Sequence, residues 1–132
     1  MNMDLKDKHT SHSLLHSFSF AIIGMVTAVK QERNMRIHLL SSVLVILISF
    51  YFSITKMEWL FILFAIGGMF SLEMINSSIE RVVDLVSPEY HLLAKQAKDL
   101  AAGAVLVFAI LSILVGAVIF LPHILSFLAG VD

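Results

Sequence analysis

The sequence predicts an all-α integral membrane protein, and three observations lead to this fold class. Of its 132 residues, 58% are hydrophobic and only 14% are charged, and the mean hydropathy is +0.91. This composition is too apolar for a soluble domain of the same length. Charge is also unevenly spread, because residues 37–55 and 100–131 contain no Asp, Glu, Lys or Arg. No cysteine is present, which excludes disulfides, thiol nucleophiles and thiolate metal ligands.

Three stretches are long enough to cross a bilayer as helices, which requires about 20 mostly apolar residues. They are residues 37–55, 59–75 and 100–121. The first two are joined only by "KMEW", so we expect a helical hairpin with Trp59 as an anchor at the membrane interface. Pro122 is expected to end the third span, since proline lacks the amide hydrogen that a helix needs.

Residues 13–30 predict an amphipathic helix before the first span. Apolar residues recur there at helical spacing on one side, with polar residues opposite. Such a helix either lies in the cytoplasmic membrane interface or covers the transmembrane helices as a packing element. Residues 1–12 are polar and lack the apolar core of a secretory signal. With no internal repeat and no long linker, residues 1–132 are interpreted as a single domain.

The basic residues predict the orientation of the chain in the membrane. Eight of the nine Lys and Arg residues lie before the first span or between the second and third spans, and only Lys56 lies on the other side. Because basic residues near membrane ends are retained in the cytoplasm, we expect a cytoplasmic N-terminus and a C-terminus outside.

Polar residues follow the second span without any turn signal, in the stretch "SLEMINSSIERVVDL" at residues 71–85. A helix turns by about 100° per residue, so Glu73, Asn76, Glu80 and Asp84 fall on one face if the helix continues. A carboxylate at the end of an apolar span usually faces protein, water or a ligand. The simpler alternative is that Glu73 only marks the membrane boundary.

Further charged residues are expected near the same cytoplasmic level. Glu32 precedes the first span, and Lys98 and Asp99 precede the third. Carboxylate oxygens suit Mg²⁺, which usually takes one or two of them together with substrate phosphates. The group therefore predicts a site for a metal and an anionic substrate, and the alternative is a solvated collar of paired charges. Neither the P-loop nor the dinucleotide-binding glycine motif is present.

The stretch "LEMINSSIERVVDLVSPEYHLLAKQAKDLAAGAVLVFA" resembles a known family of small bacterial membrane kinases. It contains the pattern E-x-x-N-[ST]-x-[IL]-E followed by A-K-D-x-x-[AS]-[AG], which resembles the diacylglycerol kinase and undecaprenol kinase family. The resemblance extends upstream through "ERNMRIH" and covers roughly residues 14–122. The segments "IGGMFSLE" and "IFLP" look most like the undecaprenol kinase branch of Gram-positive bacteria.

This resemblance implies a fold and an assembly. The family pattern is a homotrimer of three-helix subunits, each with an added surface helix, in a bacterial cell membrane. The active sites of such a trimer are composite and lie at the cytoplasmic face. The partners implied are ATP, a membrane lipid alcohol and two further copies of the chain, with no nucleic acid.

The resemblance also implies roles for individual residues. Glu73 looks like the general base that accepts the proton of the lipid hydroxyl, and Glu32 and Glu80 look like ligands of Mg²⁺. Asn76 is expected to hold the nucleotide phosphates or the base carboxylate. The remaining nucleotide contacts are expected from Glu89, Tyr90, His91, Lys98 and Asp99.

The function expected on this basis is ATP- and Mg²⁺-dependent phosphorylation of undecaprenol to undecaprenyl phosphate. The runner-up is phosphorylation of diacylglycerol to phosphatidic acid. A more remote alternative is a small membrane protein without enzymatic activity, whose carboxylates only bind cations. The pairing of Glu73, Asn76 and Glu80 with Lys98 disfavours this last alternative, because a cation collar has no need of a phosphate-binding lysine.

Overall fold

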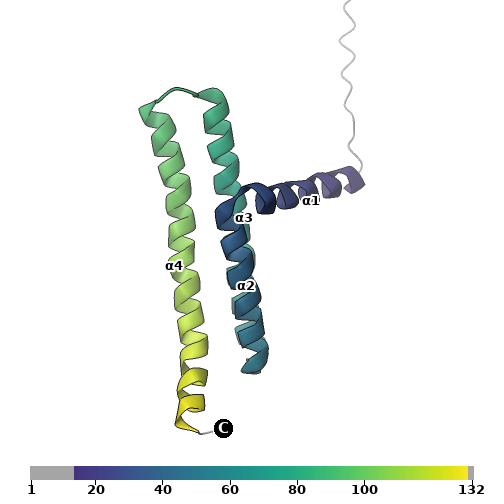
Figure 1. Cartoon of the computed structure of the whole chain (residues 1–132), viewed down its shortest axis with the longest axis vertical. Helices are drawn as coiled ribbons and strands as arrows, with labels where there is room; N and C mark the ends of the chain where they lie inside the picture. The colour runs from purple at the N-terminus through teal and green to yellow at the C-terminus, as the bar shows by residue number, and fades with distance from the viewer. Residues whose placement is uncertain (1–13, 131–132) are drawn as a thin grey trace, which may run out of the picture.

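The protein, seen in a computed structural model that describes residues 14–130, is built in that range from four helices (Figure 1). They are α1 (Leu14–Gln31), α2 (Arg33–Tyr51), α3 (Lys56–Val86) and α4 (Leu92–Ala129). The two long helices α3 and α4 run side by side in opposite directions, and α2 packs against α3. α1 projects sideways from the start of α2 (Figure 1). The all-α prediction is confirmed, and the polar segment 1–12 lies outside the described residues.

The helix after the second predicted span continues, as the sequence predicts. α3 has 31 residues and α4 has 38, which correspond to about 46 and 57 Å at 1.5 Å per residue. Both helices are therefore longer than the hydrocarbon core of a bilayer, which is about 30 Å thick. The residues from Glu73 to Asp84 lie in the last turns of α3, at the same end of the molecule as the start of α4.

The connection between α2 and α3 differs from the expected "KMEW" turn. The chain turns at residues 52–55, and Lys56 already begins α3. The reason is a capping box: Glu58 N–H donates to the Thr55 hydroxyl at 3.3 Å, and Thr55 N–H donates to the Glu58 carboxylate at 2.7 Å. These two bonds satisfy amide groups that a helix start leaves without partners. The expected position of the turn is therefore wrong by one helical turn.

The expectation that Pro122 ends the last helix is also wrong. α4 continues through Pro122 to Ala129, where Gly130 closes it with a left-handed conformation (φ 64°). A proline inside a helix costs about 3 kcal/mol because it removes one hydrogen bond and crowds the preceding turn. Ending the helix in apolar surroundings would leave four carbonyl groups without partners at several kcal/mol each. Continuation is therefore the less costly solution.

The apolar core lies at the α2–α3 turn, far from the polar end of α3. Ile54, Ile62 and Ile119 are buried there, and Trp59 packs against them. Nearer the polar end, α3 and α4 approach closely at Gly68, where an added Cβ would lie 2.2 Å from the ring of Phe108. No comparable neighbour lies within 4 Å of Gly67 or Gly103. Among these three glycines, Gly68 alone therefore lies where the two helices approach closely.

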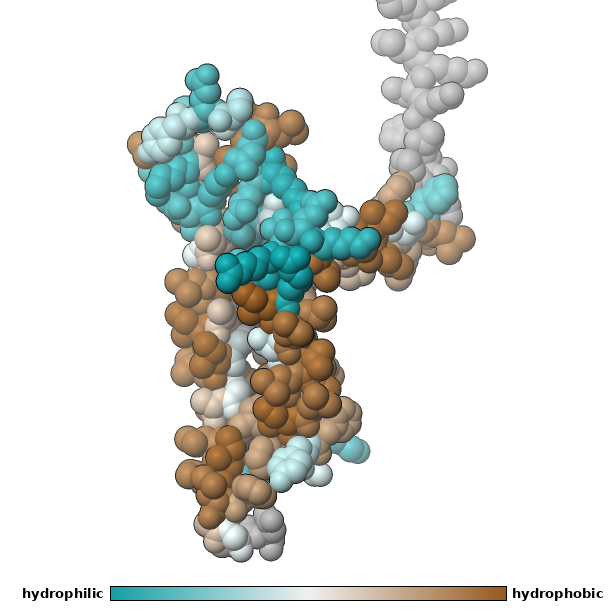
Figure 2. Space-filling view, viewed as in Figure 1, coloured by the Kyte–Doolittle hydropathy of each residue, from teal (hydrophilic) through white to brown (hydrophobic). Residues whose placement is uncertain are grey.

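The surface separates into an apolar body and a polar end (Figure 2). Apolar side chains cover α2 and much of α4, whereas hydrophilic residues gather around the α3–α4 connection and the α1–α2 junction. All four described helices are long and apolar enough to cross a membrane. Large apolar side chains exposed over such a body are suited to contact with lipid. Among the four, α1 is distinguished by its direction, since it lies across the axis of the other three (Figure 1).

Candidate functional site at the polar end of the bundle

Glu73 is a buried carboxylate in an otherwise apolar stretch of α3. Its side chain is only 2% exposed, and Oε2 has no hydrogen-bond partner within residues 14–130. A buried carboxylate without a partner is costly, so such groups are rare outside functional sites. Its burial favours a role in a site over the simpler alternative of a residue that only marks the membrane boundary.

Asn76 lies one turn further along the same face and is also buried. Its Nδ2 donates to Glu80 Oε1 at 3.1 Å, while its Oδ1 has no partner among the described residues. The carboxamide is therefore fixed by Glu80 and keeps a free acceptor oxygen. Glu73 and Asn76 together present two buried oxygen acceptors three residues apart on α3. The expected polar face of Glu73, Asn76 and Glu80 is present in the structure.

Glu32 approaches this face from the α1–α2 junction. It is the single residue between the two helices, and its carboxylate pairs with Arg81 of α3 at 2.7 Å. Arg81 was not among the residues predicted for the site, and no local sequence signal indicates the pair because the two residues are 49 positions apart. The structure brings Glu32 to the turn of α3 that carries Glu80, but no contact between the two carboxylates is present among the described residues.

A cleft with a volume of about 400 Å³ lies between the end of α3 and the start of α4. Lys98 lines it and pairs with Asp84 at 2.5 Å. The three consecutive residues predicted to contact the nucleotide, Glu89, Tyr90 and His91, line the same cleft. His91 also caps α4, because its Nδ1 accepts a hydrogen bond from Leu93 N–H at 3.2 Å. The structure therefore gathers four of the predicted nucleotide contacts, with Asp84 added.

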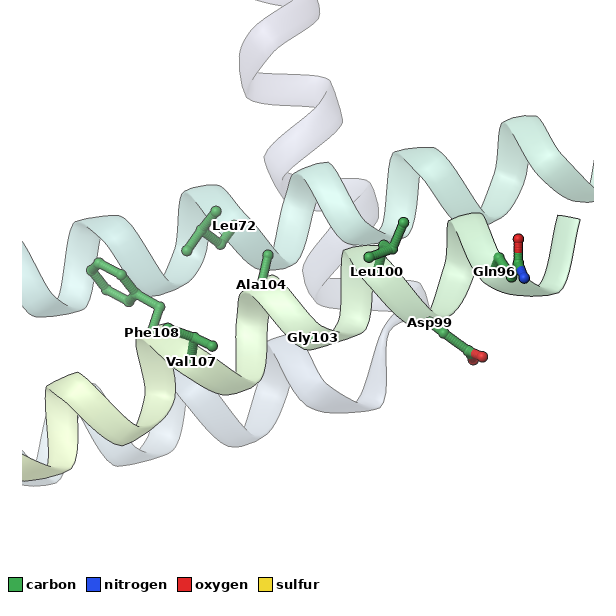
Figure 3. A pocket seen from close by; sticks show the side chains of 8 residues that line it. All are labelled: Leu72, Gln96, Asp99, Leu100, Gly103, Ala104, Val107 and Phe108. Atoms are coloured by element: carbon green, nitrogen blue, oxygen red, sulfur yellow. The ribbon is translucent and has the colours of Figure 1, made fainter. Parts of the chain in front are cut away.

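Asp99 does not join Lys98 in this cleft, although the two residues are adjacent in the sequence. Its carboxylate pairs with Lys95, one turn earlier in α4. It lines a separate hollow of about 790 Å³, with Gln96 and Asp99 at one end and Phe108 at the other (Figure 3). Leu72 of α3 borders this hollow as well. Neighbouring residues of a helix point about 100° apart, which explains the separation.

The residues of the polar end suit Mg²⁺ chemically, although they form no complete cage within one chain. The partnerless oxygens of Glu73 and Asn76 and the carboxylate of Glu80 are hard oxygen donors, which Mg²⁺ prefers. Within residues 14–130, no group of three His, Asp or Glu side chains is placed to hold a metal ion. Mg²⁺ typically needs only one or two carboxylates when substrate phosphates complete its coordination.

These features define a class of protein: a helical membrane protein with a buried polar site at the end of its bundle. Comparison with known proteins identifies the family. The sequence model of prokaryotic diacylglycerol kinase matches residues 19–120. The chain therefore belongs to the prokaryotic diacylglycerol kinase family, which confirms the resemblance described above.

Individual relatives carry two different names. The chain is 43% identical to undecaprenol kinase of Bacillus subtilis (strain 168) over 121 residues, which cover 91% of this chain and 98% of the relative. It is 40% identical to diacylglycerol kinase of Synechocystis over 115 residues, covering 86% of this chain and 66% of that protein. Diacylglycerol kinase of Haemophilus influenzae is 29% identical over 108 residues, covering 81% and 92% of the two chains.

Family membership confirms several of the predictions. The protein is a lipid kinase of a bacterial membrane, and a kinase family implies ATP as the phosphoryl donor and a lipid as the acceptor. The alternative of a non-enzymatic cation-binding protein is therefore wrong.

Proposed function

We propose that the protein transfers the γ-phosphoryl group of ATP to the hydroxyl of undecaprenol, forming undecaprenyl phosphate. The observation that carries the reaction is the buried Glu73 carboxylate, whose Oε2 lacks a partner within the described residues. The choice of undecaprenol comes from the similarity to the Bacillus subtilis enzyme, which extends over almost the whole length of both chains.

Glu73 is proposed as the general base. A lipid hydroxyl that reaches Glu73 gives up its proton to the carboxylate as its oxygen bonds to the γ-phosphorus. The bond from that phosphorus to the oxygen of the leaving ADP breaks in the same transfer. Because Glu73 lies in the α3 sequence between the apolar run and the polar last turns, the lipid can react without its chain leaving the bilayer.

The cleft between α3 and α4 is proposed as part of the nucleotide site. Lys98 supplies a positive charge to phosphate oxygens, and in this structure Asp84 neutralises that charge. Tyr90 is 81% exposed, so its ring is accessible for stacking against the adenine ring of the nucleotide. Glu89 and His91 line the same cleft. Asn76 is proposed to hold the nucleotide phosphates or the carboxylate of Glu73 through its Nδ2 amide, which donates to Glu80 in this structure.

Mg²⁺ is proposed as the cofactor, held by Glu32 and Glu80. When bound, it neutralises charge that develops on the phosphate oxygens during transfer. The chain contributes the two carboxylates and the hydrogen bond from Asn76 that fixes Glu80. Phosphate oxygens and water complete the coordination in sites of this kind.

A trimer with three spans per subunit is proposed for the assembly. Asp99 does not line the cleft that Lys98 lines, so one chain alone does not place all the predicted nucleotide contacts in one cleft. A neighbouring copy could bring its Asp99 side to the cleft. α1 is proposed to lie on the cytoplasmic surface, because its direction crosses that of the three other helices. Chemical cross-linking in membranes should produce dimers and trimers and no larger species.

Lipid preference is the experiment that tests the substrate. Purified protein in mixed micelles should phosphorylate undecaprenol with higher kcat/KM than diacylglycerol, measured as labelled γ-phosphate in the lipid fraction. Some diacylglycerol activity is expected to remain, because each lipid presents a primary hydroxyl. The discrimination must then come from apolar surface, where each buried methylene adds about 0.8 kcal/mol.

Diacylglycerol is the second candidate substrate, favoured by the names of the Synechocystis and Haemophilus relatives. A clear preference for diacylglycerol under matched conditions would replace undecaprenol as the proposed substrate. The proposed roles of Glu73, Glu32 and Glu80 would be unaffected by that result.

A further inference from the structure

The α1–α2 junction contains an ion pair to which the proposed reaction gives no role. Nη2 of Arg81 donates to Glu32 Oε1 at 2.7 Å and to Gln31 Oε1 at 3.1 Å. Arg81 belongs to α3, whereas Gln31 ends α1 and Glu32 precedes α2. One guanidinium nitrogen therefore ties the polar end of α3 to the junction of two other helices.

The backbone at Glu32 makes this tie important. Glu32 is the only residue between α1 and α2, with an extended conformation (φ −96°, ψ 123°) and no side-chain bond that caps α2. Its carboxylate is therefore directed by Arg81 and not by the helix that follows. α1 has little else to hold it, because Ala28 is its only buried residue. The Arg81 bonds are therefore suited to fix both the direction of Glu32 and the start of α1.

Arg81 engages only one of the two Glu32 oxygens. Within residues 14–130, Oε2 accepts no hydrogen bond from Arg81, so this oxygen keeps its acceptor sites for a cation. Arg81 also follows Glu80 directly in α3, so its bond keeps Glu32 beside the turn that carries Glu80. We propose that Arg81 is a positioning residue that holds Glu32 in the orientation in which Glu32 and Glu80 together bind a divalent cation. This inference rests on the proposed function, since the cation site is part of it.

The opposite role would make Arg81 an internal competitor that occupies Glu32 until the cation displaces it. Two observations disfavour competition. The contact uses a single carboxylate oxygen, and displacement of Arg81 would also break its bond to Gln31. The two roles predict opposite changes in cation affinity, so a binding measurement separates them.

The experiment measures Mn²⁺ binding without turnover, by electron paramagnetic resonance of free Mn²⁺ with full-length protein and a non-hydrolysable ATP analogue. Arg81→Gln should weaken binding by roughly three- to tenfold. This is at or below the lower end of the 10- to 100-fold range typical of groups that orient metal ligands, because the ion pair is partly exposed. Arg33→Gln is the matched control. It removes the same charge next to Glu32, its side chain makes no ion pair with Glu32 within residues 14–130, and the substitution should leave binding unchanged.

A double variant tests whether Arg81 acts through Glu32. In a Glu32→Gln background, Arg81→Gln should cause no further loss of Mn²⁺ affinity. Tighter binding in Arg81→Gln, no change, or losses that simply add in the double variant would each overturn the proposal. If the unmodified protein neither binds Mn²⁺ nor transfers phosphate, the proposed function fails together with it.

A second readout is independent of metal and activity. Spin labels at Ser19→Cys in α1 and Ala102→Cys in α4 are specific because the chain contains no cysteine, and both positions are exposed. Arg81→Gln should broaden the distance distribution between the labels, whereas Arg33→Gln should not. An unchanged distribution would show that Arg81 does not fix the junction.

Discussion

At the scale of single residues, burial distinguishes Glu73 from the other carboxylates of the polar end. Glu73 is 2% exposed, whereas Asp84, Glu89 and Asp99 are exposed. Exclusion of water around a reacting group prevents proton leakage and other side reactions with solvent. This contrast supports the proposal that Glu73, and not one of the exposed carboxylates, takes the proton.

Glu73→Gln should reduce phosphoryl transfer by about 10²- to 10⁴-fold, because an amide of the same size cannot accept the proton. Folding and assembly should be preserved, as measured by size-exclusion chromatography. Transfer of labelled γ-phosphate into the lipid fraction is the activity measurement, and Glu58→Gln at the opposite end of α3 is the matched control. Substantial activity in Glu73→Gln would end its assignment as the base.

Glu80→Gln should raise the Mg²⁺ concentration needed for half-maximal activity. The substitution removes an anionic oxygen that Asn76 holds in place at 3.1 Å, so a shift of roughly tenfold or more is expected. The measurement is a Mg²⁺ titration at saturating ATP and lipid. A titration curve identical to that of the unmodified protein would place the metal elsewhere.

The sequence predicts contacts within one helix better than contacts between helices. Glu73, Asn76 and Glu80 could be placed on one face because helical periodicity determines their relative directions. The pairs Glu32–Arg81 and Lys98–Asp84 join different helices, and their formation depends on how those helices pack. The separation of Asp99 from Lys98 has a different cause, because neighbouring residues of one helix point about 100° apart, and helical periodicity could have predicted it.

At the scale of helices, Gly68 is required for the close approach of α3 and α4. Gly68→Ala should lower the free energy of unfolding by about 1–3 kcal/mol, because the added methyl group would force the Phe108 ring to move. Gly67→Ala is the matched control, since nothing lies within 4 Å of its Cβ position. It should be neutral or slightly stabilising, as alanine favours a helix over glycine by about 1 kcal/mol. Equal effects of the two substitutions would contradict this packing.

The capping box at the start of α3 should make stability sensitive to acid. The hydrogen bond from the Thr55 backbone N–H lowers the pKa of Glu58 below its ordinary value of 4.5. The Thr55 hydroxyl and His123 act in the same direction. A lowered pKa gives stability that is present above the ordinary value and is lost as pH falls through the lowered one. Thermal unfolding should therefore show that Glu58→Gln loses less stability than the unmodified protein as the pH falls from about 6 to about 3. A parallel loss in both proteins would exclude this role.

Local signals explain where the expected helix ends succeed and fail. The pattern Thr55-x-x-Glu58 is a recognisable helix start, and it places the turn before Lys56. The apolar pattern alone placed the turn at residues 56–59. The helix was expected to end at Pro122 because proline usually ends helices that are exposed to water. In apolar surroundings the cost of exposed carbonyl groups outweighs the cost of the proline.

At the scale of the whole molecule, the proposed topology requires α3 to carry the chain across the membrane. Cysteines introduced singly at Lys56 and Val86, the exposed ends of α3, should react with an impermeant maleimide from opposite sides. The unmodified protein contains no cysteine and serves as the unlabelled control. Labelling of both positions from one side would exclude a membrane-spanning α3.

The fold class and the approximate positions of the membrane helices, though not their ends, follow from composition and apolar run length. Assembly does not follow in the same way. Large apolar side chains such as Leu63, Phe64 and Ile113 are exposed in the single chain. Lipid and a second subunit would cover them equally well, because lipid tails are as apolar as a helix surface. The sequence therefore identifies a membrane protein without indicating which of its faces meet another copy.

The apolar core and the polar end lie far apart along the same helix. Ile62 belongs to the buried cluster near the α2–α3 turn, and Glu80 lies about 27 Å further along α3. Local opening in proteins needs only the free energy of the contacts that it breaks. Fraying of the last turns of α3, the start of α4 and the α1–α2 junction would leave the cluster of Ile54, Ile62 and Ile119 intact. Local opening can therefore occur at the end of the bundle that is proposed to bind nucleotide and lipid, while the opposite end stays folded.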